Sequence, residues 1–123
     1  MPVMPEPSLQ PLRIPTGWEI QWNMFLDTES GFEADDHASI GFGEDLLQLV
    51  HGRNSVLIDL GWYPDGDPHG TFRLLAIRKS PDDTKMSVSW ANPLKMLESR
   101  SKAEIVQAVE DWLRHFAEVA KQG

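Results

Sequence analysis

Two stretches of this chain have the residue types of a metal site. Asp65-Gly-Asp-Pro-His69 alternates acids around a glycine, as the opening of a calcium-binding loop does. Such a loop also needs a third oxygen ligand two residues on and a bidentate acid at its twelfth position, where His69 and Ala76 stand here. Asp35-Asp36-His37 offers only adjacent ligands. The sequence therefore predicts no metal and no cofactor, and Asp and Gly act in both stretches as turn formers.

Nucleophilic or acid–base catalysis is the second chemistry to weigh. The sequence has four histidines, a residue type suited to acid–base catalysis, yet no Gly-x-Ser-x-Gly elbow surrounds any serine. The absence of cysteine removes thiolate catalysis, and Gly41-x-Gly43 lacks the third glycine of a phosphate-binding loop. We expect a protein that is not an enzyme. The alternative is a small-ligand-binding or hydrolase-like domain with a cleft near residues 65–69.

The net charge of −8 comes from one segment of the chain. Between Ile14 and Gly52 there is no Lys or Arg, and the remaining acids and bases cancel. A one-signed segment attracts a basic partner and repels nucleic acid and anionic membranes. We call it the acid-only segment, and its acids are Glu19, Asp27, Glu29, Glu33, Asp35, Asp36, Glu44 and Asp45.

Aromatic residues beside acids indicate where a partner would be held. Trp62 and Tyr63 end a predicted strand that runs into the Asp- and Gly-rich loop, a composition typical of protein-binding hot spots. Packing of the same pair in the core or at its rim stays open as an alternative. The predicted partner-binding residues are Asp27, Glu29, Glu33, Asp35, Asp36, Trp62, Tyr63, Asp65 and Asp67.

The hydrophobic pattern predicts the elements that position these residues. Ser101 and Glu104 have the spacing of a capping box, followed by an amphipathic helix of about 18 residues. The pattern at 86–90 and 94–98 fits two short strands or one broken strand. This order predicts an α+β fold, an antiparallel meander of about five strands with the C-terminal helix packed on one face. Alternating apolar residues indicate the other strands at 18–25, 44–51, 55–63 and 71–79.

Length and composition predict one domain. The 123 residues divide into a proline-rich, extended lead-in at 1–16 and a single α+β domain at 17–123. In that domain Trp18, Trp22 and Trp112 fall on predicted core faces. The start has no signal-peptide pattern and no apolar run is long enough for a membrane span, so we expect a soluble, cytoplasmic monomer or weak dimer.

Several stretches of the chain resemble the small predicted immunity proteins encoded beside bacterial polymorphic toxins of the Rhs and contact-dependent inhibition kind. The most distinctive is the Gly-Trp-Tyr-Pro run at 61–64. The resemblance implies a small, acidic, cytoplasmic, non-enzymatic protein that binds and neutralises a cognate toxin domain, commonly a basic nuclease. It identifies no contact residues, because such surfaces diverge with each toxin. The stretches that carry it are Ile14-Pro-x-Gly17-Trp18, Trp22-Asn-x-Phe25, Asp45-Leu-Leu-Gln48, Asp59 to Pro68, and Glu98-Ser-Arg-Ser101.

Overall fold

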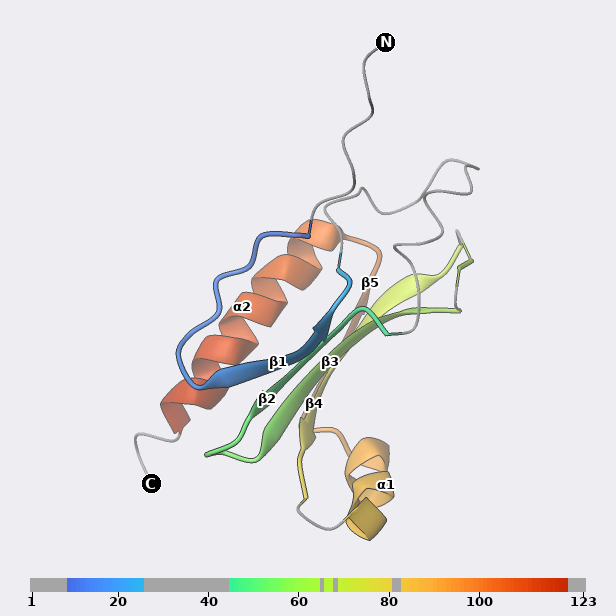
Figure 1. Ribbon diagram of the computed structural model, residues 1–123. Helices are drawn as coiled ribbons and strands as arrows, with labels where there is room; N and C mark the ends of the chain where they lie inside the picture. The colour runs from blue at the N-terminus through green and yellow to red at the C-terminus, as the bar shows by residue number, and fades with distance from the viewer. Residues whose placement is uncertain (1–8, 26–44, 65, 68, 81–82, 120–123) are drawn as a thin grey trace.

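A computed structural model describes residues 9–25, 45–64, 66–67, 69–80 and 83–119. Five strands form one antiparallel sheet in the order β1-β2-β3-β4-β5, a meander, and the long C-terminal helix α2 lies along one face of it (Figure 1). This architecture confirms the predicted α+β fold. The elements are β1 (Trp18–Asn23), β2 (Leu47–His51), β3 (Val56–Tyr63), β4 (Thr71–Arg78), α1 (Asp83–Ala91), β5 (Lys95–Ser99) and α2 (Lys102–Val119).

The core lies between the sheet and α2, with β3 as the central strand. Seven of the eight β3 residues are buried, since both faces of this strand are covered. α2 presents an apolar stripe to the sheet at helical spacing, as predicted. Trp112, which the pattern also assigned to the core, is only partly buried. The fully buried stripe of α2 is Ile105, Val109 and Leu113, joined by Phe116 at its end.

The first turn of α2 is capped by Ser101. The Glu104 backbone N–H donates to Ser101 Oγ at 3.2 Å, one half of the predicted capping box. The Ser101 N–H donates instead to Ser99 Oγ at 3.0 Å, so the reciprocal bond is replaced by the preceding serine. Helix α2 therefore begins where the sequence predicted.

The predicted strand at 86–90 is wrong, because these residues belong to helix α1. The free edge of β4 can pair with one strand only, and Lys95–Ser99 occupies it. A segment with no strand to pair with satisfies its backbone groups internally as a helix. The Asn92 side chain then donates to the carbonyl of Val88 at 2.9 Å and ends α1.

A bulge in β1 corrects the predicted alternation of its apolar residues. Ile20 pairs with Leu49, but Trp22 pairs with Gln48, and the register shifts between them. An extra residue in one strand moves the next side chain to the other face of the sheet. Trp18 and Ile20 therefore share the α2 face, whereas Trp22 lies on the opposite face.

Residues 9–16 of the proline-rich lead-in run beside α2 (Figure 1). The Arg13 backbone N–H donates to Glu110 Oε2 at 2.8 Å, while Leu12 and Ile14 pack against the core. A helix is about 10 Å wide and five strands at about 4.8 Å spacing span roughly twice that. The lead-in fills part of the sheet face that one helix leaves uncovered. The packed part of the chain therefore includes residues that precede residue 17.

Helices long and apolar enough to cross a membrane are absent from the described parts of the chain.

Candidate functional site

The predicted partner-binding residues fall into two groups. Asp27, Glu29, Glu33, Asp35, Asp36 and Asp65 lie outside the described residues. Trp62, Tyr63 and Asp67 are described and lie together where β3 ends.

Trp62 belongs to the core. Its side chain is fully buried, its ring packs edge-to-face on Phe72 at 4.9 Å, and its Nε1 donates to the carbonyl of Asp67 at 2.7 Å. In this conformation the indole presents no surface to a partner. The structure therefore favours the core alternative for Trp62 over the predicted partner-binding role, because the alternation of β3 turns its side chain toward α2 with Ile58 and Leu60.

Tyr63 and Asp67 already have contacts within the chain. The Arg73 guanidinium lies 4.4 Å from the centre of the Tyr63 ring and pairs with Glu98 at 3.2 Å. One Asp67 carboxylate oxygen accepts the His69 backbone N–H at 2.8 Å, which is the local bond of an Asx turn. Asp67 therefore shapes its loop, as the turn interpretation expected.

Exposed apolar side chains gather on β1 and just after it. Ile20 is 47% exposed, Trp22 38% and Met24 54%. β1 is an edge strand of the sheet, and all three residues belong to the acid-only segment. Ile20 lies on the α2 face of β1 and Trp22 on the opposite face, so these side chains flank the edge of the sheet. Exposed apolar side chains along an unpaired edge are typical of a surface that another molecule covers. We call these three residues the β1 patch.

Asp59 is a buried carboxyl group that the sequence analysis did not single out. It lies on the sheet face opposite α2 and is 7% exposed, and its Oδ1 accepts a hydrogen bond from Gln48 Nε2 at 3.2 Å. Burial raises the pKa of Asp59 to about 6, nearby Asp45 adds to the rise, and the Gln48 hydrogen bond opposes it. A signal was present in the sequence, since Asp59 stands in a strand with apolar residues on both faces, which is typical of a strand covered on both sides.

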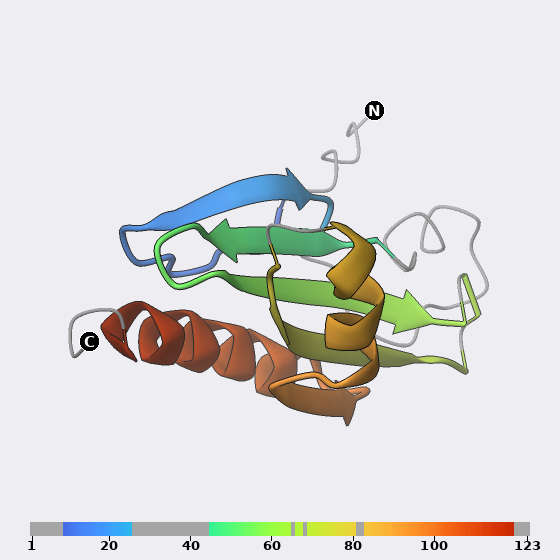
Figure 2. The ribbon, with the colours of Figure 1, turned by 90° about the horizontal axis from the view of Figure 1, so that it is seen from below.

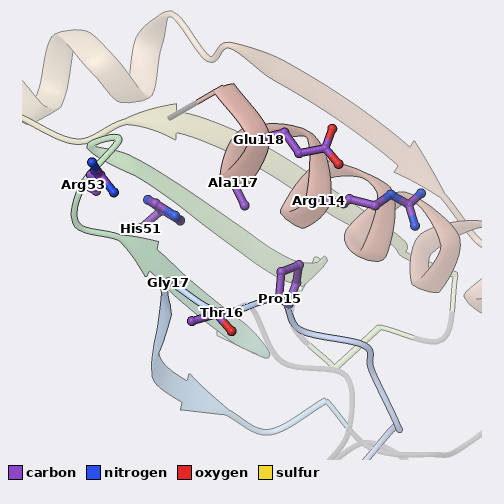
Figure 3. A pocket seen from close by; sticks show the side chains of 8 residues that line it. All are labelled: Pro15, Thr16, Gly17, His51, Arg53, Arg114, Ala117 and Glu118. Carbon is purple, nitrogen blue, oxygen red and sulfur yellow. The ribbon is translucent and has the colours of Figure 1, made fainter. Parts of the chain in front are cut away.

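A cavity of about 560 Å³ opens between α2 and the end of β2 (Figure 3). His51 forms one wall, buried against Trp18 at 5.1 Å, and its Nδ1 accepts the Asn54 backbone N–H at 3.2 Å. The proton of a neutral imidazole is then on Nε2. A Cβ on Gly17, whose φ is 107°, would lie 2.6 Å from that nitrogen, so only glycine fits there.

The His51 cavity lacks the arrangement of a catalytic triad. Figure 3 shows Glu118 and Arg114 extending from α2 away from the His51 ring. The position behind His51 Nδ1 is taken by a backbone N–H, where a triad needs a carboxylate that accepts from the imidazole. The hydrogen bonds around His51 therefore differ from those of a Ser-His-Asp triad.

Among the described residues, no three His, Asp or Glu side chains are grouped closely enough to hold a metal ion. No protein-family model, curated protein or solved structure matches the chain.

Proposed function

We propose that this protein is a cytoplasmic, immunity-type inhibitor that binds a basic toxin domain through the acid-only segment and the β1 patch. The observation that carries the proposal is the exposure of Ile20 and Trp22 on an edge strand inside that segment, and of Met24 directly after it. The proposed partner is a protein, and neither a nucleic acid nor a membrane.

The β1 patch and the acids supply complementary parts of such an interface. Exposed aromatic and Met side chains provide the apolar contact from which hot spots form. The acids provide attraction at a distance, which raises the rate of encounter with a basic surface. In this interface the main apolar contact is proposed for Trp22 instead of Trp62, because Trp62 is in the core.

The resemblance to immunity proteins gives the class of partner. It agrees with a small chain of 123 residues whose net charge is −8. Immunity-type inhibition needs only that the bound protein cover the toxin's active site or an adjoining surface. No chemistry by this chain is required.

A capture experiment tests the proposal with charge-matched variants. The test variant changes Asp27, Glu29, Glu33, Asp35 and Asp36 to Asn or Gln. The control makes the same change of charge outside the acid-only segment, at Glu6, Asp82, Asp83, Glu104 and Glu118. Each tagged protein is used to capture partners from the source lysate at low salt, and bound chains are released by salt and identified by mass spectrometry.

The proposal predicts a stoichiometric basic polypeptide with wild type and control that the test variant loses. The captured polypeptide should then be toxic when expressed alone and harmless when expressed with wild type. A partner that the test variant keeps, or one that is not toxic, contradicts the proposal.

A further inference from the structure

Positive charge gathers at the end of the sheet that carries the β2–β3 turn. Arg78 and Lys79 lie at the end of β4, and Lys85 lies in the first turns of α1. Phe25 and Asp45 lie at the other end of the sheet, and six acids of the acid-only segment stand between them in the sequence. We call the part of this end that carries Arg78, Lys79 and Lys85 the cationic end, in a chain whose net charge is −8.

A cavity of about 660 Å³ lies at this cationic end. Its charged walls are Arg78, Lys79 and Lys85, and three serines line it as well. Among the residues whose side chains the structure describes, a set that does not include Asp82 and Asp83, no carboxylate lines the cavity or forms an ion pair with these three cations. An adjoining cavity of about 240 Å³ shares Lys79 and two of the serines and extends to Gly52 in the β2–β3 turn. We call the larger one the cationic cavity; its serines are Ser55, Ser80 and Ser89.

Helix α1 builds one wall of the cationic cavity. Lys85, Val88 and Ser89 are spaced at i, i+3 and i+4, so they lie on one face of the helix. Met86 packs instead against Val50, Leu57 and Ile77 and fixes α1 on the sheet. Figure 2 shows α1 lying across the sheet on the side away from α2. The cavity thus lies between α1, the end of β4 and the β2–β3 turn, and the Met86 contact holds α1 against the sheet.

Val88 gives this wall an apolar part. Val88 is 63% exposed and lies among the charged and hydroxyl groups of the cavity. An exposed valine beside three cations matches a ligand that has both an anionic and an apolar portion. A volume of about 660 Å³ also exceeds the space of a bare inorganic anion and falls within the range of roughly 300–1,000 Å³ for small-molecule sites.

We propose that the cationic cavity binds a small organic phosphate, with the phosphate among Arg78, Lys79 and Lys85 and the organic portion against Val88. A phosphate monoester carries a charge of about −1.5 to −2 at pH 7 and three acceptor oxygens. Lys and Arg donate charge-assisted hydrogen bonds to such oxygens, and the serine hydroxyls add neutral ones. The net charge of −8 repels an extended polyanion such as nucleic acid, whereas a small ligand fits within the local field of the cavity.

This inference goes beyond the proposed inhibitor function and does not depend on it. The cationic cavity and the proposed acidic interface use different residues. Loss of phosphate binding would leave partner capture unchanged, and loss of partner capture would leave phosphate binding unchanged.

Titration followed by amide NMR tests the proposal on the full chain. The probes are inorganic phosphate, adenosine 5′-monophosphate and acetate at constant ionic strength, with chloride as the reference salt. We expect saturable shifts at Ser55, Lys79 and Ser89 with the nucleotide, weaker binding of inorganic phosphate, and the weakest binding of acetate. Shifts that chloride reproduces, or equal affinity for acetate, overturn the phosphate assignment. Equal affinity for the nucleotide and inorganic phosphate overturns the role of Val88.

Matched variants locate the site. Ser89→Asp places a carboxylate in the cavity, and Ser87→Asp makes the same change at an exposed position two residues away on α1. Lys85→Gln removes one cation of the cavity, and Lys95→Gln removes one that lies 5.8 Å from the Trp112 ring on the α2 side. We expect Ser89→Asp and Lys85→Gln to weaken binding about tenfold, the effect of one charge-assisted hydrogen bond. The two control variants should bind as wild type does.

Lys85 is exposed, so Lys85→Gln keeps the test decisive even if Ser89→Asp disturbs folding. Equal losses in Lys85→Gln and Lys95→Gln would show that only overall charge matters and would overturn the site.

Discussion

The indole Nε1 of Trp62 donates a 2.7 Å hydrogen bond to the backbone carbonyl of Asp67. This bond connects the buried end of β3 to the loop at 64–70, a loop whose turn residues the sequence identified. The loop is therefore anchored by the core. Gly70 lies at the same contact, because a Cβ there would lie 2.6 Å from Trp62 Nε1 and 2.5 Å from the Tyr63 carbonyl oxygen.

Gly70→Ala should destabilise the protein by about 1–3 kcal/mol, the range for overpacking a filled site. The Tyr63 carbonyl belongs to the backbone of β3 and cannot move aside without disturbing the sheet. Urea denaturation measures the free energy of unfolding. Gly52→Ala is the control, since no atom lies within 4 Å of a Cβ at that position. Equal effects of the two substitutions would contradict the close contact.

Asp59→Asn should stabilise the protein at pH 7.5 and not at pH 3.5. Because the folded-state pKa of Asp59 is raised from 3.8 to about 6, the folded state holds this proton more tightly than the unfolded chain. The stabilisation that comes from the bound proton is therefore fully present below about pH 4 and is lost as pH rises to about 6. Removing the buried charge should therefore raise the free energy of unfolding by about 1–3 kcal/mol at pH 7.5.

Urea denaturation at both pH values checks the Asp59 prediction. Asp45→Asn is a useful comparison, because it removes only the neighbouring charge and should give a smaller gain at pH 7.5. A destabilisation by Asp59→Asn of equal size at both pH values would show that the carboxylate is not penalised by burial.

Trp22→Ser should weaken partner binding at least 30-fold, the effect of losing a hot spot of about 2 kcal/mol. Its effect on folding should stay near 1 kcal/mol, because an exposed edge residue makes few core contacts. Met96→Ser is the matched control, since Met96 is 60% exposed on β5, the opposite edge of the sheet. Affinity is measured by calorimetry and stability by urea denaturation. A loss of affinity in Met96→Ser as large as that in Trp22→Ser would exclude the β1 patch as the interface.

The sequence predicted the sheet and α2 because their signals are local. Alternation in 55–63 and helical spacing after Ser101 each depend on neighbouring residues only, and the structure has both elements with nearly the predicted bounds. The strand predicted at 86–90 failed for a non-local reason. Its alternation is genuine, but pairing was decided by which segment reached the edge of β4.

The candidate site depended more strongly on contacts between distant residues. The bulge before Trp22 reverses its face, and alternation alone cannot locate an inserted residue. The burial of Trp62 follows from the position of β3 in the centre of the sheet, which also buries Asp59. The cationic cavity joins residues of β4 and α1, so its composition emerges only once α1 is a helix.

Acids of the acid-only segment are proposed to steer a basic partner onto the β1 patch. Stopped-flow measurement of association with the captured partner over a series of salt concentrations tests this claim most directly. For wild type we expect an association rate that approaches about 10⁸ M⁻¹s⁻¹ at low salt and falls toward about 10⁵–10⁶ M⁻¹s⁻¹ as salt rises, with dissociation changing much less. The variant neutralised at Asp27, Glu29, Glu33, Asp35 and Asp36 should be slow at every salt concentration. A wild-type association rate that does not change with salt would contradict the claim.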